Sequence, residues 1–381
     1  MSGAVLCRRV DSYDSPALEA AVEELFAACP AADALGPDSR VLVKPNLLAK
    51  HPPAHAVTTH PAVVAACVRA LQRRGVRRIT VADSPGGVYT PGVLRGIYAA
   101  SGMAQVCADT GAQLYTACRY EPVACHGARV SAFQLIEPAA QADFIVDCPK
   151  VKTHVMTGLS CAVKNMFGTV PGLQKAELHM RFPQRGPFGQ MLMDLWQCVR
   201  PGLVVADGVL AMEGDGPAGG VPRQLGLILG GNDGWTVDLA LCRMMGFEPC
   251  QVPYLAAGIE AGLCPPRFDT ALLRGDADAL APVPDWKRPS GFAGVDFSAS
   301  VPRPVRWLVP GAEKLVAPRP KIRRDRCVGC GKCAEICPGH TIRVERGKAH
   351  IDPAGCIRCF CCHEMCPVKA IDVKRFFLFR M

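Results

Sequence analysis

Two stretches of this 381-residue chain decide its C-terminal fold: CVGCGKCAEICP at residues 327–338 and CIRCFCCHEMCP at residues 356–367. Each has three cysteines in the spacing Cys-x2-Cys-x2-Cys, then a fourth cysteine after three more residues, followed directly by proline. Closely spaced thiolates on a tight loop can hold three corners of an iron–sulfur cube, and a more distant cysteine closes it. The two stretches therefore predict a module that binds iron–sulfur clusters.

The doubled motif is typical of two-cluster bacterial-type ferredoxins, in which the fourth cysteine of each motif serves the other cluster. We expect two 4Fe-4S clusters, one on Cys327, Cys330, Cys333 and Cys366, the other on Cys356, Cys359, Cys362 and Cys337. A zinc module is the alternative, but zinc sites use four ligands in two pairs and fit a doubled set of four less well. Cys361 breaks the spacing and is expected to be a packed or free thiol. Because such clusters cycle between two charge states, the module is expected to transfer single electrons.

The remaining cysteines indicate a reducing compartment. Nine of the 21 cysteines lie between Cys327 and Cys366, and the others are scattered from Cys7 to Cys264 in mostly apolar settings, typical of small buried hydrophobes. So many free thiols favour a cytosol over an oxidising compartment. We find no apolar segment of signal-peptide type at the N-terminus and no apolar run of roughly 18 residues. The sequence predicts a cytoplasmic protein without a membrane span, although attachment to a membrane complex through a partner stays open.

The net charge of +9 is concentrated in the cysteine-rich module, where residues 321–381 hold thirteen Lys and Arg against six Asp and Glu. Two oxidised clusters with about two negative charges each would offset most of this excess. The sequence has no nucleic-acid recognition motif, so we expect no nucleic-acid partner.

The N-terminal part has the pattern of an α/β domain. Helix starts are marked by Ser15, His60 and Thr90, each directly before a proline in a first turn. Between the helices lie apolar runs of strand length at 41–46, 78–83, 143–150, 203–207 and 225–231. Such alternation predicts a mostly parallel sheet covered by helices, followed by a small α+β two-cluster ferredoxin-like domain. We expect the α/β domain at 1–280, a Pro-rich linker at 281–320 and the ferredoxin domain at 321–381.

Polar side chains follow several of the predicted strands. In an open parallel sheet, ligands bind beyond the carboxyl ends of the strands. Lysines there can bind a carboxylate or phosphate, and acids can orient them, hold a cation or transfer protons. The candidate catalytic residues are Lys44, Asp83, Lys150, Lys152, Lys164 and Asp207. His154 is expected to be a structural hydrogen-bonding residue, and neither a GxGxxG nor a GxxxxGK[ST] nucleotide motif is present.

These segments resemble the domain of unknown function 362 family. The matching stretches are KPN (44–46), TTHP (58–61), ADSPGG (82–87), PKVKTHVMTGLSCAVKNMFGTVPG (149–172) and DGVLAMEGDGP (207–217). The resemblance runs from about Lys44 to Gly246, and members often carry the same C-terminal double-cluster module. It implies an iron–sulfur protein with a redox role, and it supplies no established reaction.

Three functions fit the sequence. We favour an oxidoreductase that passes single electrons from a partner protein through two 4Fe-4S clusters to an anionic small-molecule substrate in the α/β domain. The first alternative is a non-catalytic electron carrier or maturation partner for another redox enzyme. The second is non-redox catalysis with structural clusters. A flavin or a divalent metal as a further cofactor is neither indicated nor excluded.

Overall fold

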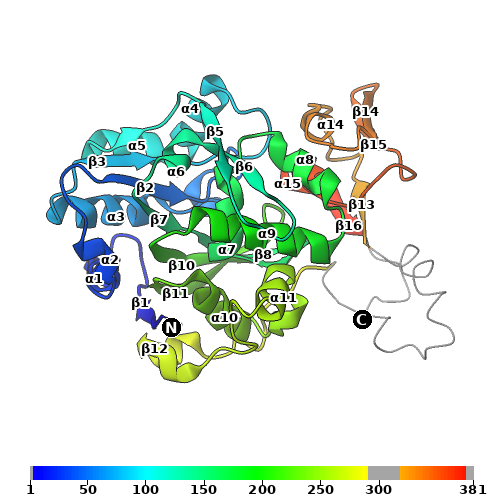
Figure 1. Cartoon of the computed structure of the whole chain (residues 1–381). Coiled ribbons are helices and arrows are strands. Elements are labelled where there is room, and N and C mark those ends of the chain that lie inside the picture. Colours follow the sequence, from blue (N-terminus) through cyan, green and yellow to red (C-terminus); the bar gives the residue numbers. More distant parts are fainter. Residues whose placement is uncertain (1–2, 291–317, 375–381) are drawn as a thin grey trace.

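The computed structural model describes residues 3–290 and 318–374. Its central sheet has ten strands: β1 (Val5–Arg9), β2 (Arg40–Pro45), β3 (Arg78–Val81), β4 (Gln113–Leu114), β7 (Phe144–Cys148), β8 (Lys150–His154), β9 (Gly158–Ser160), β10 (Leu203–Glu213), β11 (Val221–Gly231) and β12 (Leu273–Gly275). They lie in the order β12-β1-β11-β10-β7-β2-β3-β4, with β8 paired to β10 and β9 paired to β8 (Figure 1). Most pairings between these described strands are parallel, and those of β11 with β1 and β10, and of β8 with β9, are antiparallel.

Helices cover both faces of the sheet. One group comprises α1 (Pro16–Ala27), α2 (Pro30–Asp33), α3 (Pro61–Arg73), α4 (Pro91–Ser101) and α5 (Met103–Thr110). The other comprises α6 (Glu137–Ala140), α7 (Ala162–Asn165), α8 (Gln174–Arg181), α9 (Arg185–Val199), α10 (Gly234–Met244) and α11 (Pro253–Glu260). Alternate residues of β10 point to opposite faces, so Val205 packs in the core with α1 and α3, and Val204 in the core with α9 and α10. The predicted α/β class is confirmed.

Short elements complete this part of the chain. A separate hairpin is formed by β5 (Tyr120–Ala124) and β6 (Ala132–Ile136). The 3-10 turns are η1 (Pro53–His55), η2 (Met166–Thr169), η3 (Pro249–Gln251), η4 (Thr270–Leu272) and η5 (Ala277–Leu280).

The predicted helix starts are confirmed by their caps. Ser15 Oγ accepts from the backbone N–H of Ala17 at 3.2 Å, and His60 Nδ1 accepts from that of Ala62 at 3.2 Å. Thr90 is the N-cap residue of α4, although its side chain makes no capping hydrogen bond.

The structure corrects the sequence prediction at two strands. The run expected to end at 207 continues as β10 to Glu213, so Asp207 lies within a strand rather than after one. The polar stretch expected after the run at 143–150 forms strand β8, in which Lys150 pairs with Asp207 and Lys152 with Met212 of β10. The lysines of β8 are buried. Buried strands are predicted from runs of apolar residues, so a strand with buried lysines is missed.

The C-terminal module is small and of mixed α+β type. Its elements are β13 (Arg319–Ile322), α14 (Lys332–Glu335), β14 (Ile342–Glu345), β15 (Lys348–Ile351), α15 (Cys361–Glu364) and β16 (Ile371–Lys374). They form two antiparallel pairs, β13 with β16 and β14 with β15. The module, coloured orange to red in Figure 1, lies beside α8, whose Ala176 packs against Ile336 and Cys361. Residues 291–317 of the expected linker lie outside the described residues, and the domain boundaries stay a prediction.

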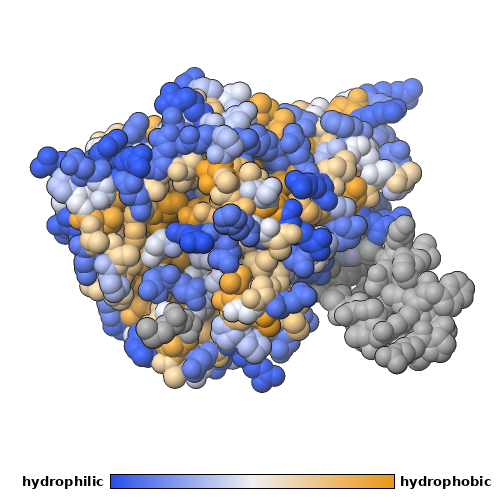
Figure 2. All heavy atoms as spheres, viewed as in Figure 1, coloured by the Kyte–Doolittle hydropathy of each residue, from blue (hydrophilic) through white to orange (hydrophobic). Residues whose placement is uncertain are grey.

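The visible face of the molecule is mixed in character. Figure 2 shows hydrophilic residues spread across it, with hydrophobic residues in smaller areas between them. Among the described residues, no helix combines the length and apolar character needed to cross a membrane.

Candidate functional site

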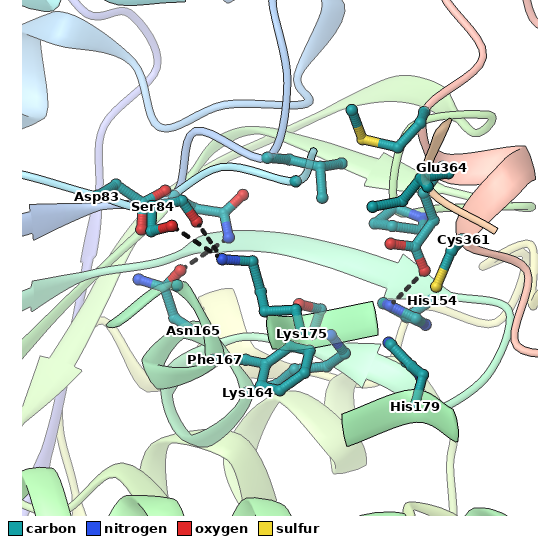
Figure 3. Close-up of a pocket in the computed structure, with 18 of the residues that line it drawn as sticks. Asp83, Ser84, His154, Lys164, Asn165, Phe167, Lys175, His179, Cys361 and Glu364 are labelled. Atoms are coloured by element: carbon teal, nitrogen blue, oxygen red, sulfur yellow. Dashed lines mark hydrogen bonds and ion pairs between the residues drawn. The ribbon is translucent and has the colours of Figure 1, made fainter. Parts of the chain in front are cut away.

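A cavity lies where the C-terminal module meets the α/β domain. Its walls come from the ends of β2 and β3, from β8 and β9, from α7, η2 and α8, and from the module. In Figure 3, His154, Cys361 and Glu364 lie at one end of the cavity, and Asp83, Ser84 and Asn165 at the other. The polar side chains that line it belong to Asn46, Asp83, Ser84, Lys152, His154, Ser160, Lys164, Asn165, Lys175, His179, Cys361 and Glu364.

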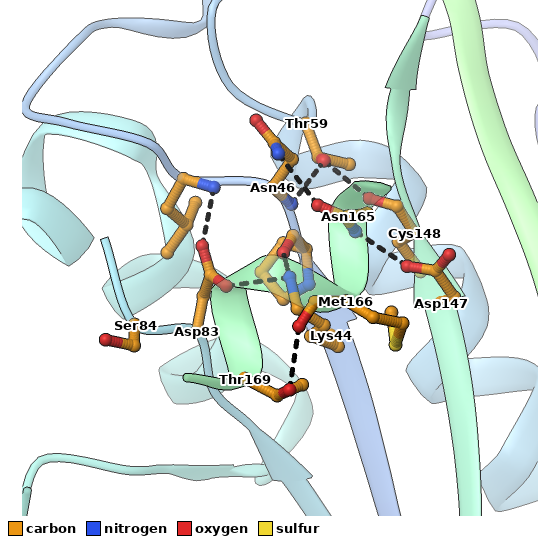
Figure 4. Close-up of polar contacts among 12 residues, drawn as sticks. Lys44, Asn46, Thr59, Asp83, Ser84, Asp147, Cys148, Asn165, Met166 and Thr169 are labelled. Carbon is orange, nitrogen blue, oxygen red and sulfur yellow. Dashed lines mark hydrogen bonds and ion pairs between the residues drawn. The ribbon is translucent and has the colours of Figure 1, made fainter. Parts of the chain in front are cut away.

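An ion pair lies at the carboxyl ends of β2 and β3. These strands are parallel neighbours, which brings Lys44 and Asp83 to the same edge of the sheet. Lys44 Nζ lies 2.7 Å from Asp83 Oδ1, and both side chains are almost fully buried. Asp83 Oδ2 accepts from the backbone N–H of Leu47 at 2.9 Å, and Lys44 Nζ donates to the carbonyl of Pro45 at 2.9 Å. Of the pair, Asp83 lines the cavity, whereas Lys44 contacts Asp83 and is not among the lining residues (Figure 4).

A chain of amides continues from this pair toward β7. Asn46 Nδ2 donates to Asn165 Oδ1 at 2.7 Å, and Asn165 Nδ2 donates to Asp147 Oδ1 at 2.6 Å (Figure 4). Burial raises the pKa of Asp147 well above its usual value. These bonds leave the carbonyl oxygen of Asn46 free to accept, and Lys152 Nζ donates to it at 2.7 Å. The network therefore fixes the orientation of the Asn46 amide and the position of the Lys152 ammonium.

Lys152 is buried and carries no carboxylate partner among the described residues. Its Nζ donates a second hydrogen bond to the carbonyl of Val57 at 2.8 Å. Burial, and next the neighbouring charge of Lys164, lower the pKa of Lys152 to about 7. Its charge at neutral pH is therefore sensitive to what occupies the cavity.

His154 links the α/β domain to the module. Its Nδ1 accepts from the backbone N–H groups of Met156 at 3.1 Å and Thr157 at 3.4 Å, which assigns the ring proton to Nε2. That Nε2 lies 3.3 Å from Glu364 Oε1. Burial lowers the pKa of His154 to about 4. Burial opposes ionisation of Glu364, but the adjacent groups, His154 first and then Lys164, outweigh it and lower the pKa of Glu364 to about 2. At neutral pH a neutral imidazole thus lies beside a carboxylate.

Three further side chains line the cavity, those of Lys164, His179 and Lys175. Lys164 Nζ lies 5.4 Å from the centre of the Phe167 ring and has no hydrogen bond or ion pair within the described part of the chain. His179 Nδ1 is buried without a partner there, and burial lowers the pKa of His179 to about 3. Lys175 Nζ is saturated, since it donates to Ser84 O at 2.8 Å, Ser84 Oγ at 3.0 Å and Val170 O at 2.5 Å.

Lys150 and Asp207 form a separate network away from the cavity. Lys150 Nζ lies 2.7 Å from Asp207 Oδ2 and 3.0 Å from the hydroxyl of Tyr13, which donates to Asp207 Oδ1 at 2.8 Å. The backbone N–H of His60 completes the acceptor set of Asp207 at 2.8 Å, and the rings of Tyr13 and His60 stack at 3.5 Å. Every partner of this ion pair is internal, which indicates a structural role.

The cysteines of the module gather in two sets. Cys327, Cys330, Cys333 and Cys366 line one small cavity. Backbone N–H groups point at two of these sulfurs, from Ala349 to Cys327 Sγ at 3.4 Å and from Ala370 to Cys366 Sγ at 3.1 Å. The remaining motif cysteines are electrostatic neighbours: Cys359, Cys356, Cys333 and Cys337 all act on the pKa of Cys362, and Cys359 and Cys337 act on that of Cys356. The fourth cysteine of the second motif thus lies with the first three of the first motif, and the assignment of Cys337 to the other cluster stays a prediction.

Cys361 lines the cavity between the α/β domain and the module (the interdomain cavity), and its thiol is free and buried. The side chain of Cys361 is the first cause of the lowered pKa of Cys359. Among the described residues, no three His, Cys, Asp or Glu side chains converge on a position that would hold a single metal ion.

The structure brings together part of the predicted site. Asp83, Lys152 and Lys164 line the interdomain cavity, Lys44 stands behind Asp83, and Lys150 and Asp207 lie elsewhere. Sequence reasoning missed Lys175, His179 and Glu364 as lining residues. Glu364 sits between two cysteines of the second motif, where its sequence position gives no sign that it faces another domain. His154, expected to be structural, lines the cavity, and its Nε2 lies 3.3 Å from Glu364 Oε1.

Comparison with known proteins finds a matching family for each of the two parts of the chain. Residues 41–243 match the family described as Domain of unknown function (DUF362), and residues 319–367 match a 4Fe-4S dicluster domain. The thylakoid-associated protein sll1697 of Synechocystis sp. is 32% identical over 273 residues, which cover 71% of this chain and 82% of that protein. Among solved structures, the lactate racemase apoprotein from Thermoanaerobacterium thermosaccharolyticum aligns with 64% of this chain and 57% of its own, at 11% identity and a TM-score of 0.43.

Proposed function

This chain belongs to the DUF362 family and carries a 4Fe-4S dicluster domain that supports an iron–sulfur electron-transfer role, and we propose that it is an oxidoreductase acting on an anionic small molecule. One observation carries the proposal: the cavity between the two parts is lined by lysines of the α/β domain and by Cys361 and Glu364 of the module. Cys361 is next in sequence to Cys362 and lowers the pKa of Cys359, two of the predicted cluster ligands. A ligand in this cavity would lie beside a cluster-binding motif.

We assign two 4Fe-4S clusters to the two sets of cysteines. The residues present fit this cofactor because four cysteines line one small cavity and backbone N–H groups point at their sulfurs. The donor from Ala349 lowers the pKa of Cys327 and so favours the thiolate that binds iron. When bound, each cluster supplies a centre that gains or loses one electron at a time.

Cysteine variants test the assignment. Cys366→Ala and Cys337→Ala should each lower the iron content from about eight to about four atoms per chain, since each removes the closing ligand of a different cluster. Cys361→Ala should keep all the iron and, by removing a thiol that acts on the ligand Cys359, shift the potential of one cluster. Iron analysis and a potentiometric titration followed by electron paramagnetic resonance measure both effects. Loss of iron from Cys361→Ala would contradict the assignment.

The α/β domain supplies ligand binding and charge control in this proposal. Lys152 and Lys164 hold the anionic group of the ligand, and Asp83, fixed by Lys44, faces it from the opposite end of the cavity. Lys150 and Asp207 have all their partners within the protein, so we assign them no part in binding.

Cluster reoxidation separates this enzyme from a non-catalytic carrier or maturation partner. The protein is purified anaerobically, reduced, and mixed with fractions of a small-molecule extract while the resonance signal of the reduced clusters is followed. An enzyme is expected to lose the signal with a specific fraction. A protein with intact clusters that no fraction oxidises would instead be a carrier, and a stable complex with a redox enzyme would then identify its partner.

A partner protein that donates or accepts electrons completes the proposal, because a 4Fe-4S dicluster domain exchanges electrons with a redox partner. The cytoplasmic location stays a prediction. The similar Synechocystis protein is named as thylakoid-associated, which supports testing peripheral attachment to a membrane as well.

A further inference from the structure

The two cysteine motifs of the module differ in their exposure. In the second motif, Cys359, Cys361 and Cys362 are buried, and Cys361 lines the interdomain cavity. In the first motif, Cys333 is buried, but Cys330 is exposed. The second motif therefore lies toward the α/β domain, whereas the first motif reaches the outer surface of the module.

Exposed apolar side chains border the small cavity of one cysteine set, which we call the outer cysteine set. It comprises Cys327, Cys330, Cys333 and Cys366. Val328, Pro367 and Val368 line the same cavity and reach the surface, with Val328 62% exposed and Val368 39% exposed. Protein interfaces bury an apolar centre inside a polar rim. A partner protein that covered Val328 would lie directly beside the cluster assigned to the outer cysteine set.

Basic side chains flank this apolar group within the first motif. Arg326, directly before Cys327, is exposed, and so is Lys332, which lines the cavity with Val328. Lys332 is paired with Glu335 at 3.1 Å, whereas Arg326 forms no ion pair with a described residue. Arg326 therefore has its charge available to a partner.

The β14–β15 turn brings two more basic side chains to the same loop. A Cβ atom on Gly329 would lie 2.4 Å from the carbonyl oxygen of Gly347, so the turn packs directly on the loop. Arg346, next to Gly347, is exposed, and Lys348 Nζ donates to the carbonyl of Cys327 at 2.7 Å. Figure 1 shows this hairpin on the side of the module that faces away from the α/β domain. Basic groups from two elements therefore meet at one loop of the first motif.

The charge of the module is uneven along its sequence. Residues 321–350, which hold the first motif, have eight Lys and Arg against three Asp and Glu, whereas residues 351–374 have three of each. A cluster with about two negative charges leaves the first part positive and makes the second part negative. A negatively charged protein surface is therefore steered to the first motif, where the outer cysteine set lies.

We propose that Val328, Pro367 and Val368, with the basic side chains around them, form a docking face for an acidic protein that carries one electron at a time. One electron passes between this carrier and the cluster of the outer cysteine set. One of the two is oxidised as the other is reduced, and no atom or proton moves with the electron. The cluster of the second motif then connects the docking face to the interdomain cavity. This inference rests on the proposed function, since it takes the module to transfer electrons.

Binding of acidic carriers tests the inference. An acidic 2Fe-2S ferredoxin and an acidic flavodoxin are titrated calorimetrically into the full-length protein with its clusters, under anaerobic conditions, beside the basic carrier cytochrome c. At about 20 mM salt, at least one acidic carrier is expected to bind at least tenfold more tightly than cytochrome c. Raising the salt to about 300 mM should weaken that binding at least tenfold, because salt screens exposed charges.

Charge reversals make the test specific. Arg326→Glu/Arg346→Glu should weaken binding of the carrier at least tenfold, and should slow electron transfer from the reduced carrier to the oxidised clusters by a similar factor. Val328→Glu should do the same, because it places a negative charge at the centre of the face. Arg77→Glu is the control and should bind like wild type, since Arg77 is exposed just before β3, at the end of that strand opposite to Asp83.

Iron analysis shows whether each variant keeps its clusters. If Arg326→Glu loses iron, Arg346→Glu alone lies outside both cysteine motifs and should still weaken binding at least threefold. The inference is overturned if neither acidic carrier binds better than cytochrome c, or if these variants bind the carrier like wild type.

Vesicles of phosphatidylglycerol separate a protein partner from a membrane surface. An anionic membrane attracts the same charges, but three small apolar side chains on loops bury little area in it. Vesicles that bind wild type and not Arg326→Glu/Arg346→Glu, in a protein that neither carrier binds, would make this face a membrane contact and overturn the inference.

The same measurements separate this inference from the proposed function. Salt-sensitive reduction by an acidic carrier, in a protein whose clusters no extract fraction reoxidises, would retain the docking face and remove the oxidoreductase. Reoxidation by an extract fraction, in a protein that acidic carriers neither bind nor reduce, would retain the oxidoreductase and remove the docking face.

Discussion

Lys44 and Lys150 carry charge into the protein interior because each has a carboxylate oxygen 2.7 Å from its ammonium nitrogen. Such a pair gains little over apolar residues of the same volume, but the loss of one partner leaves a buried charge alone. Lys152 and Lys164 are different, because both lack a carboxylate partner within hydrogen-bonding distance among the described residues. At the scale of single residues, the lysines therefore divide into structural and ligand-facing kinds.

Lys44→Met should lower the free energy of unfolding by about 3–5 kcal/mol, since it leaves Asp83 buried and unpaired. The double variant Lys44→Met/Asp83→Leu should recover most of the loss. Urea denaturation followed by circular dichroism, with exposed Lys50→Met as the control, measures both. A loss below about 1 kcal/mol in the single variant would show that the pair is not a structural unit.

The pKa of Lys152, lowered by burial to about 7, makes stability depend on pH. Between pH 7 and about 10, the unfolded chain still binds the lysine proton and the folded chain does not, so stability rises with pH. Lys152 should contribute up to about 1.4 kcal/mol per pH unit to that rise. Below pH 7 the folded and unfolded chains both bind the proton, so Lys152 adds no pH dependence there. Denaturation midpoints of wild type and Lys152→Met at pH 6, 7, 8 and 9 should therefore separate above pH 7. Parallel curves over the whole range would contradict the lowered pKa.

At the scale of elements, the site depends on the close approach of η2 to the end of β3. A Cβ atom on Gly168 would lie 2.7 Å from Lys44 Nζ and closer still to Asp83 Oδ1. The backbone N–H of Ser84 also donates to the carbonyl of Gly168 at 2.8 Å. Because Gly168 has no side chain, η2 can pack directly against the Lys44–Asp83 ion pair.

Gly168→Ala should destabilise the fold by several kcal/mol, because the methyl group would displace either the turn or the ion pair. Gly186→Ala is the matched control. Gly186 lies in α9, and a Cβ atom added there would have no other atom within 4 Å, so alanine should leave stability unchanged or raise it slightly. Thermal unfolding of both variants gives the comparison, and equal melting temperatures would refute the role of Gly168.

At the scale of the whole molecule, the module is held on the α/β domain by contacts around α15. His363 Nε2 lies 3.0 Å from the carbonyl of Asp215, Lys369 Nζ donates to the carbonyl of Gly220 at 3.2 Å, and Met365 lies over Gly86. These contacts surround the cavity, so the same docking that joins the two parts also closes the proposed site.

Gly219→Ala should weaken this docking, because its Cβ would lie 2.6 Å from two atoms of the His363 ring. We expect full iron content but at least tenfold slower reoxidation of the clusters by the ligand. Gly92→Ala, at a position with open space around it, should behave like wild type. A Gly219→Ala protein with wild-type reoxidation would show that electron transfer does not need this contact.

Much of this architecture was predictable from local pattern. The cysteine spacing predicted the dicluster module, and proline with a capping side chain predicted the starts of α1 and α3. Strand β8 was not predictable, because buried ion pairs and amide contacts let lysines occupy positions where periodicity expects apolar residues. Glu364 and His179 were missed for another reason. Both line a cavity that forms where two separate parts of the chain dock, and no sequence spacing encodes that arrangement.

The central claim is that the interdomain cavity is where the ligand takes electrons from the protein, and stopped-flow reoxidation of reduced clusters tests it most directly. Wild type, Lys164→Met and Lys50→Met are each mixed with the active ligand and, separately, with ferricyanide. The account predicts that Lys164→Met loses reoxidation by the ligand at least a hundredfold, keeps reoxidation by ferricyanide, and differs in this from Lys50→Met. Reoxidation of Lys164→Met by the ligand at the wild-type rate would contradict it.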